Sequence, residues 1–130
     1  MFDKNIAVDI ILILIFTSVT ISLAQENLIC KSWKKNYATL NGEIAKNETN
    51  DENYRVTFFE NHDLEYLENK MLLKGSWKLD FQNKFITFNF ENGPKNFVLD
   101  LIKLTENELV LELKQEENKG TKTLYLIPSN

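Results

Sequence analysis

Short runs in which apolar and polar residues alternate recur along most of this chain. In the run LLKGSWKLD, residues 72–80, an apolar side chain or a glycine stands at every second position from Leu73 onward. Successive side chains of a β-strand point to opposite faces, so such a run forms a strand with one buried and one solvated face. Half-solvated strands are typical of antiparallel sheets. The sequence therefore predicts an all-β fold.

Eight runs are predicted to be strands, because each is rich in β-branched, aromatic or leucine residues and is bounded by turn-forming residues. They are Cys30–Leu40, Tyr54–Phe59, Leu64–Asn69, Leu72–Asp80, Lys84–Phe90, Asn96–Leu104, Leu109–Glu116 and Thr121–Ile127. Nearly all are joined by short turns, which predicts an up-and-down antiparallel meander. Closing such a sheet removes its two exposed edges. We therefore predict an eight-stranded meander closed into a small barrel.

A glycine and a tryptophan stand two residues apart on the predicted inner face of residues 72–80. A glycine inside a strand allows a sharp bend or a close approach of another backbone. Gly75 is expected to serve this purpose where the barrel wall curves, and Trp77 is expected to fill the closed end of the barrel.

The N-terminal segment differs from the rest of the chain. Residues 10–24, IILILIFTSVTISLA, carry no charge and end in Ser22 and Ala24, which have the size and spacing that a signal peptidase requires. A membrane-spanning helix needs about 20 apolar residues, and this stretch reaches that length only by counting back through Asp9. We predict a signal peptide at residues 1–24 and one barrel domain at residues 25–130, with an uncleaved anchor as the alternative.

Composition narrows the classes of partner and site. The formal net charge is −4 and no basic stripe is present, so no nucleic-acid partner is expected.

Cys30 is the only cysteine, which excludes an intramolecular disulfide. We expect Cys30 to be a small buried hydrophobe; a lipid attachment site is the alternative, although bulky Ile29 precedes it. His62, the only histidine, lies in the predicted turn ENHD and is expected to be solvent-exposed. No catalytic or metal-ligand pattern is found, so no enzyme activity, cofactor or metal is expected.

Three short motifs, LICKSW, GSWKLD and LTENELVLEL, occur in an order and spacing that resemble the small lipocalin-like domains of exported bacterial proteins. The resemblance covers residues 25–130 and implies a lipocalin-like barrel in the periplasm or outside the bacterial cell. It also implies that the connection Asn41–Asn53 covers the barrel mouth, whereas its composition favours a solvated loop. The sequence departs from the larger lipocalins, whose first strand carries G-x-W, because Lys31 takes the glycine position before Trp33.

An eight-stranded barrel either is filled by its own side chains or holds one small ligand. The side chains expected to face the interior, and to line any ligand site, are Trp33, Lys35, Tyr37, Phe58, Tyr66, Trp77 and Phe88. Strict alternation from Trp33 to Tyr37 points Lys35 inward, which indicates either a bulge or barrel-end position, or a charged anchor for an acidic ligand.

Two function classes follow. The first is an exported protein that binds a small hydrophobic or amphipathic molecule without catalysis. The second is a protein-binding barrel with a filled core, such as a secreted-protease inhibitor or an envelope accessory protein. It would act through exposed apolar side chains, for which the candidates are Phe59, Leu67, Phe85, Val98 and Ile102. In both cases, membrane contact is expected only through the signal peptide or a lipid anchor.

Overall fold

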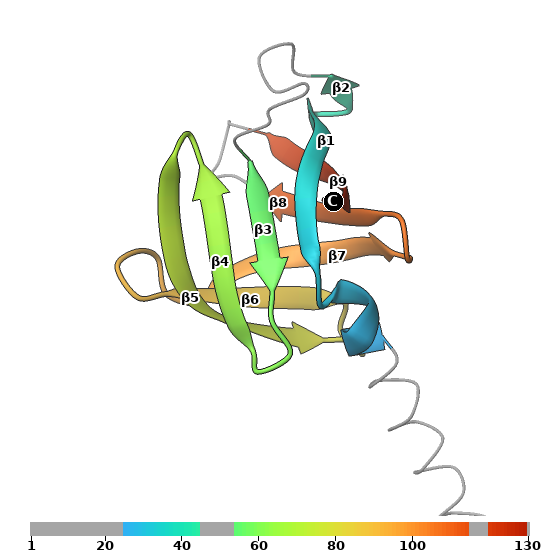
Figure 1. Ribbon diagram of the computed structural model, residues 1–130. Coiled ribbons are helices and arrows are strands. Elements are labelled where there is room, and N and C mark those ends of the chain that lie inside the picture. Colours follow the sequence, from blue (N-terminus) through green and yellow to red (C-terminus); the bar gives the residue numbers. More distant parts are fainter. Residues whose placement is uncertain (1–24, 45–53, 115–119, 130) are drawn as a thin grey trace, which may run out of the picture.

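The computed structural model describes residues 25–44, 54–114 and 120–129 of this 130-residue chain (Figure 1). These residues form a helical segment at 25–29 and nine strands. The strands are β1 (Ser32–Leu40), β2 (Glu43–Ile44), β3 (Arg55–Phe58), β4 (Asp63–Glu68), β5 (Met71–Asp80), β6 (Phe85–Phe90), β7 (Phe97–Leu104), β8 (Leu109–Lys114) and β9 (Thr121–Pro128). The predicted signal peptide and most of the connection Asn41–Asn53 lie outside the described residues.

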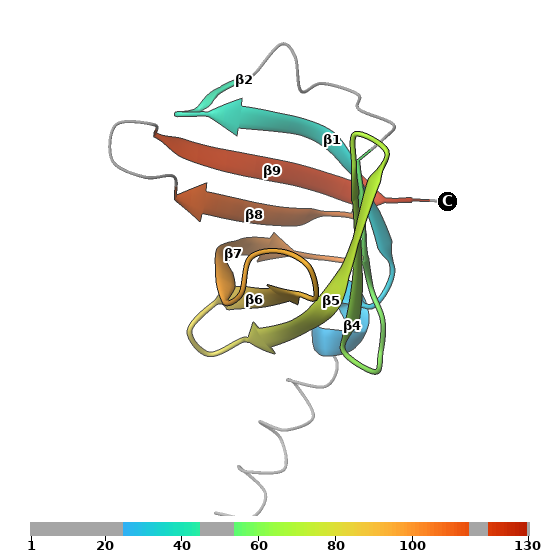
Figure 2. The same cartoon turned by 90° about the vertical axis from the view of Figure 1, so that its left-hand side faces the viewer.

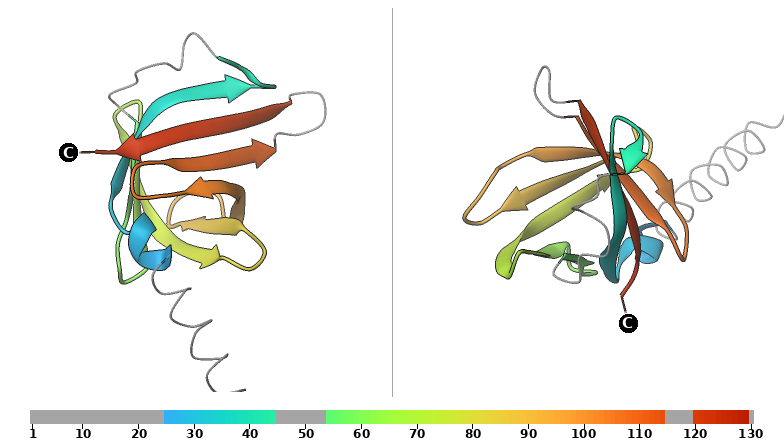
Figure 3. Two further views of the ribbon diagram at one scale, coloured as in Figure 1. Left: turned by 90° about the vertical axis from the view of Figure 1, so that its right-hand side faces the viewer. Right: turned by 90° about the horizontal axis from the view of Figure 1, so that it is seen from above.

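The strands form one antiparallel sheet in the order β2-β1-β3-β4-β5-β6-β7-β8-β9, and β1 pairs with β9 to close it. Figure 2 shows the sheet curling around a common interior, and Figure 3 shows β1 and β9 side by side at the closure. β2 is a two-residue extension paired only with the end of β1, so eight strands make the barrel wall. The prediction of a closed eight-stranded meander is confirmed, and each predicted strand matches its counterpart to within two residues at either end.

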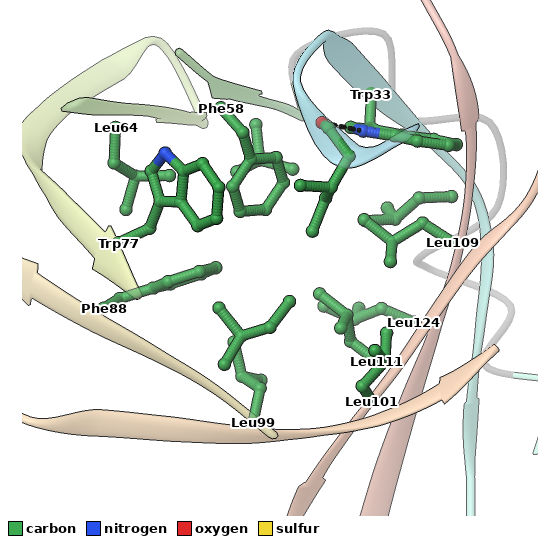
Figure 4. Close-up of a cluster of buried hydrophobic side chains, with 14 of the residues drawn as sticks. Trp33, Phe58, Leu64, Trp77, Phe88, Leu99, Leu101, Leu109, Leu111 and Leu124 are labelled. Carbon is green, nitrogen blue, oxygen red and sulfur yellow. Dashed lines mark hydrogen bonds between the residues drawn. The ribbon is translucent and has the colours of Figure 1, made fainter. Parts of the chain in front are cut away.

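The interior is lined by the side chains that alternation predicts. In β6, for example, Ile86, Phe88 and Phe90 are buried while the intervening Thr87 and Asn89 are partly exposed. Figure 4 shows Phe58, Trp77 and Phe88 converging from β3, β5 and β6, with Leu99 and Leu111 opposite them. The core is therefore built from all sides of the barrel.

Gly75 lies where β5 crosses β6 at short range. A Cβ atom placed at Gly75 would overlap the carbonyl oxygen of Asn89 and lie 2.9 Å from the Cα atom of Phe90. The glycine permits a backbone approach that any side chain would prevent. The role predicted for Gly75 is confirmed.

A β-bulge interrupts β1. The pairing of β1 with β9 shifts between Lys35, which pairs with Leu126, and Tyr37, which pairs with Tyr125. The extra residue, Asn36, reverses the alternation of the strand. Lys35 therefore remains inside and is 6% exposed, whereas Tyr37 faces outward and stacks on Tyr125 with ring centroids 4.3 Å apart. The expected inward orientation of Tyr37 was wrong for this reason, and the bulge proposed to explain Lys35 is present.

The helical segment at residues 25–29 was not anticipated from the sequence. It lies across one end of the barrel (Figure 1), and its last residue, Ile29, is fully buried. Cys30 follows it as a free thiol, packed against the core but only half-buried. Within the described ranges, no helix has the length and apolar character needed to cross a membrane.

Candidate functional site

The two ends of the barrel differ in how they are covered. At one end, residues of the helical segment at 25–29 lie beside the turns between β3 and β4, β5 and β6, and β7 and β8. Here Trp33, completely buried, donates its indole Nε1–H to the carbonyl oxygen of Ile29 at 3.0 Å, a hydrogen bond drawn in Figure 4. The main-chain N–H of Phe58 also bonds to the carbonyl oxygen of Lys31. We call this the closed end.

A cavity of about 300 Å³ occupies the opposite half of the interior. It is lined by residues at the far ends of the strands, including Tyr54 before β3, Glu68 at the end of β4 and Lys122 near the start of β9. Small-molecule sites usually have volumes of about 300 to 1,000 Å³, so this cavity suits a compact ligand. As the described residues form it, the barrel is therefore filled in its closed half and hollow in the opposite half, which we call the open half.

One wall of the cavity is apolar. It consists of Phe88, Phe90, Phe97, Leu99, Leu111 and Leu113, from β6, β7 and β8. The rings of Phe88 and Phe97 are stacked with centroids 6.5 Å apart, and Phe90 meets Phe88 edge to face at 5.9 Å. These contacts hold the aromatic rings in place as a preformed apolar surface.

The facing wall carries the polar groups. Tyr66 donates its hydroxyl to Oε2 of Glu68 at 2.8 Å, and its ring meets the ring of Tyr54 edge to face at 5.2 Å. Burial, together with the neighbouring Tyr54 and Glu68, raises the pKa of Tyr66 far above its usual value. The phenol therefore remains protonated and continues to donate to Glu68.

Two lysines lie near the cavity. Lys122 lines the cavity directly. Lys35 is not a lining residue; it lies against Tyr54, with its Nζ 5.1 Å from the ring centroid. Both lysines have further interaction partners.

The structure divides the predicted site residues into three groups. Tyr66 and Phe88 line the cavity, and Lys35 borders it behind Tyr54. Trp33, Phe58 and Trp77 pack in the filled half instead, where Phe58 meets Trp77 edge to face at 5.5 Å. Tyr37 lies outside the barrel on the face it shares with Tyr125.

Sequence reasoning missed Glu68 and Lys122 as cavity residues. The signal for Glu68 was present, because alternation along Leu64, Tyr66 and Glu68 places all three on one face of β4. Its charge argued for the solvated face. At the rim of a barrel, however, an inward side chain can be polar because it borders the opening.

The exposed apolar side chains do not form one patch. Phe59 and Leu67 line a groove on the outer surface together with Leu72, beside Arg55 and Glu65. The other candidates, Phe85, Val98 and Ile102, belong to β6 and β7, and neither strand contributes a residue to that groove.

His62 lies at the closed end, away from the cavity. It is half-exposed in the turn before β4, its ring is 4.7 Å from the ring of Trp77, and its Nε2 lies 3.8 Å from Oε2 of Glu26. Within residues 25–44, 54–114 and 120–129, no three histidine, cysteine or acidic side chains gather as a metal site would require.

The sequence matches no protein-family model and no curated protein. Among the solved structures that resemble the fold are two proteins from Bacteroides. A DUF4847 family protein from Bacteroides vulgatus superposes with a TM-score of 0.56 at 15% identity, over 78% of this chain and 95% of that protein. A lipocalin-like protein from Bacteroides uniformis superposes with a TM-score of 0.53 at 14% identity, over 75% of this chain and 96% of that protein. The expected resemblance is thus confirmed, and this chain has the fold of the small lipocalin-like barrels.

Proposed function

We propose that this chain is an exported, non-catalytic binding protein that holds a small hydrophobic or amphipathic molecule in the open half of its barrel. The observation that carries the proposal is the cavity of about 300 Å³, one wall of which is apolar and aromatic. Removing apolar ligand surface from water against such a wall contributes roughly 25 cal/mol per Å². The polar groups near the rim then orient the ligand.

Export rests on the N-terminal sequence. The uncharged segment of residues 10–24 ends in small residues before Gln25, which supports cleavage at that point and delivery to the periplasm or the cell exterior. Mass spectrometry of the protein recovered from the producing cell should find a chain beginning at Gln25. Recovery of intact Met1, or of a lipid on Cys30, would contradict this part of the proposal.

Ligand binding can be tested with a neutral apolar probe. Phenylnaphthylamine, titrated into residues 25–130, is expected to give a saturable rise in fluorescence as the dye enters the apolar cavity. Fatty acids, retinoid-like molecules and haem-like molecules, added as competitors, should define the accepted size, and the small volume favours the most compact of them.

Blocking the cavity provides the decisive variant. Leu113→Trp places a large side chain among the lining residues of β8, whereas Glu112→Trp adds the same side chain at the neighbouring position, which alternation places on the outer face. Saturable dye binding should be lost in the first variant and retained in the second. Equal binding by both variants would place the dye outside the barrel and contradict the proposal.

The alternative, a protein-binding barrel, is supported by the outer groove that Phe59, Leu67 and Leu72 line. It predicts that no compact apolar molecule binds saturably, because the groove rather than the interior would be the working surface. The dye titration therefore separates the two functions.

A further inference from the structure

A carboxylate and three aromatic rings meet at the rim of the cavity. Glu68 lies at the end of β4 and lines the cavity, as do Tyr54, Tyr66 and Phe90. Tyr54 precedes β3, Tyr66 and Glu68 lie toward the end of β4, and Phe90 ends β6, which β5 separates from β4. The arrangement indicates the charge of the ligand that would fit best.

Glu68 is the acidic side chain that lines the cavity, and its carboxylate can accept hydrogen bonds beyond the one from Tyr66. Its Oε2 accepts a hydrogen bond from Tyr66, and among the described residues it forms no ion pair. Lys122, which also lines the cavity, already has an interaction partner, and so has Lys35 behind Tyr54. A carboxylate oxygen accepts more than one hydrogen bond, so Glu68 can bind a further donor or cation inside the cavity.

The rings around Glu68 strengthen this preference. Tyr66 is the central member: its ring meets that of Tyr54 at 5.2 Å and that of Phe90 at 5.7 Å, both edge to face. In an edge-to-face pair the electron-poor edge of one ring meets the electron-rich face of the other, and a ring face that is not used in such a contact can attract a cation. Tyr54 already binds one cation in this way, because the Nζ of Lys35 lies 5.1 Å from its centroid.

We propose that the cavity binds an organic monocation, namely an amine or a quaternary ammonium attached to a compact apolar body. The cationic group lies beside Glu68 and the rings of Tyr66 and Phe90, and the apolar body lies against Phe97 and Leu111 deeper in the cavity. This assignment rests on the proposed function and adds the charge and orientation of the ligand.

Three compounds with one skeleton test the assignment: phenylbutylamine, phenylbutanol and phenylbutyrate carry a cation, a neutral hydroxyl and an anion on the same apolar body. Isothermal titration of residues 25–130 near pH 7 and at low salt should show the amine binding about tenfold more tightly than the alcohol, with the acid the weakest. In Glu68→Gln the amine should bind no better than the alcohol. Glu65→Gln, on the same strand but in the outer groove, is the control and should retain the preference.

The outcomes separate this assignment from the proposed function. Binding of phenylbutyrate as tight as that of the amine, or an amine preference that survives in Glu68→Gln, overturns the cationic assignment while the dye result still supports cavity binding. Binding of none of the three compounds also overturns it. Because the first comparison uses the unmodified chain, it holds even if a variant does not fold.

Discussion

The indole Nε1 of Trp77 donates a hydrogen bond to the main-chain carbonyl oxygen of Phe59 at 3.0 Å. The same oxygen accepts the main-chain N–H of His62, so one carbonyl connects β5 to the turn that begins β4. Trp77 is 3% exposed and packs edge to face on Phe58. This relationship places Trp77 in the filled, closed half of the barrel rather than at the cavity.

Truncating Trp77 should therefore affect stability and spare binding. Trp77→Ala is expected to lower the free energy of unfolding by about 3 to 5 kcal/mol, because it removes a packed aromatic side chain. Trp77→Phe keeps an aromatic ring, although a smaller one, and loses the hydrogen bond, which by itself contributes about 1 kcal/mol. Urea denaturation measures both values. Dye binding by Trp77→Phe should equal that of the unmodified chain, and loss of binding would mean that the cavity extends to the closed end.

Gly75→Ala should destabilise the barrel although alanine is a small residue. Its methyl group would overlap the carbonyl oxygen of Asn89, which is main-chain and cannot rotate away, so β5 and β6 must separate locally. Overpacking of this kind costs about 1 to 3 kcal/mol. Gly93→Ala is the control, because the contact there is with the side chain of Phe90 at 3.2 Å. Thermal unfolding of the two variants should show the larger loss for Gly75→Ala.

Alkaline pH should destabilise the protein partly through Tyr66. Burial raises the pKa of this phenol in the folded state, whereas the unfolded chain ionises it near pH 10. The unfolded state therefore releases a proton first, so the stabilising contribution of Tyr66 is complete below about pH 10 and decreases above it. Denaturation between pH 8 and pH 11 should show a steeper decline for the unmodified chain than for Tyr66→Phe. If the stability of both proteins declined equally with pH, the predicted coupling between ionisation of Tyr66 and unfolding would be contradicted.

Cys30 should react slowly with alkylating reagents. Burial, and then the charges of Glu60 and Glu26, raise the pKa of its thiol, so little of the reactive thiolate is present at pH 8. Mass spectrometry with iodoacetamide should record slower modification of the folded chain than of the urea-unfolded chain. Glu60→Gln should increase the folded-state rate, whereas Glu65→Gln, in the outer groove, should leave it unchanged.

Alternation of apolar and polar residues was enough to predict the strands, their antiparallel order and the inward faces of β5 and β6. The signal is local, because successive side chains point to opposite sides of any strand. The structural role of Gly75 could also be predicted from the sequence, because a glycine in a strand with regular alternation indicates that another backbone approaches closely.

The bulge in β1 and the position of the cavity depended on tertiary structure. One unpaired residue, Asn36, reverses which side chains of β1 face inward, and its effect appears only when β1 pairs with β9. The cavity likewise depends on side chains from different strands at the same level of the barrel. The buried rings of Trp33, Phe58 and Trp77 help to fill the closed half, whereas the side chains between Tyr66 and Leu113 leave space in the other half. The sequence by itself determined which side chains face the interior wherever a strand is regular, because alternation is local. The pairing between strands decided where a bulge reverses that alternation and which inward side chains lie at the same level.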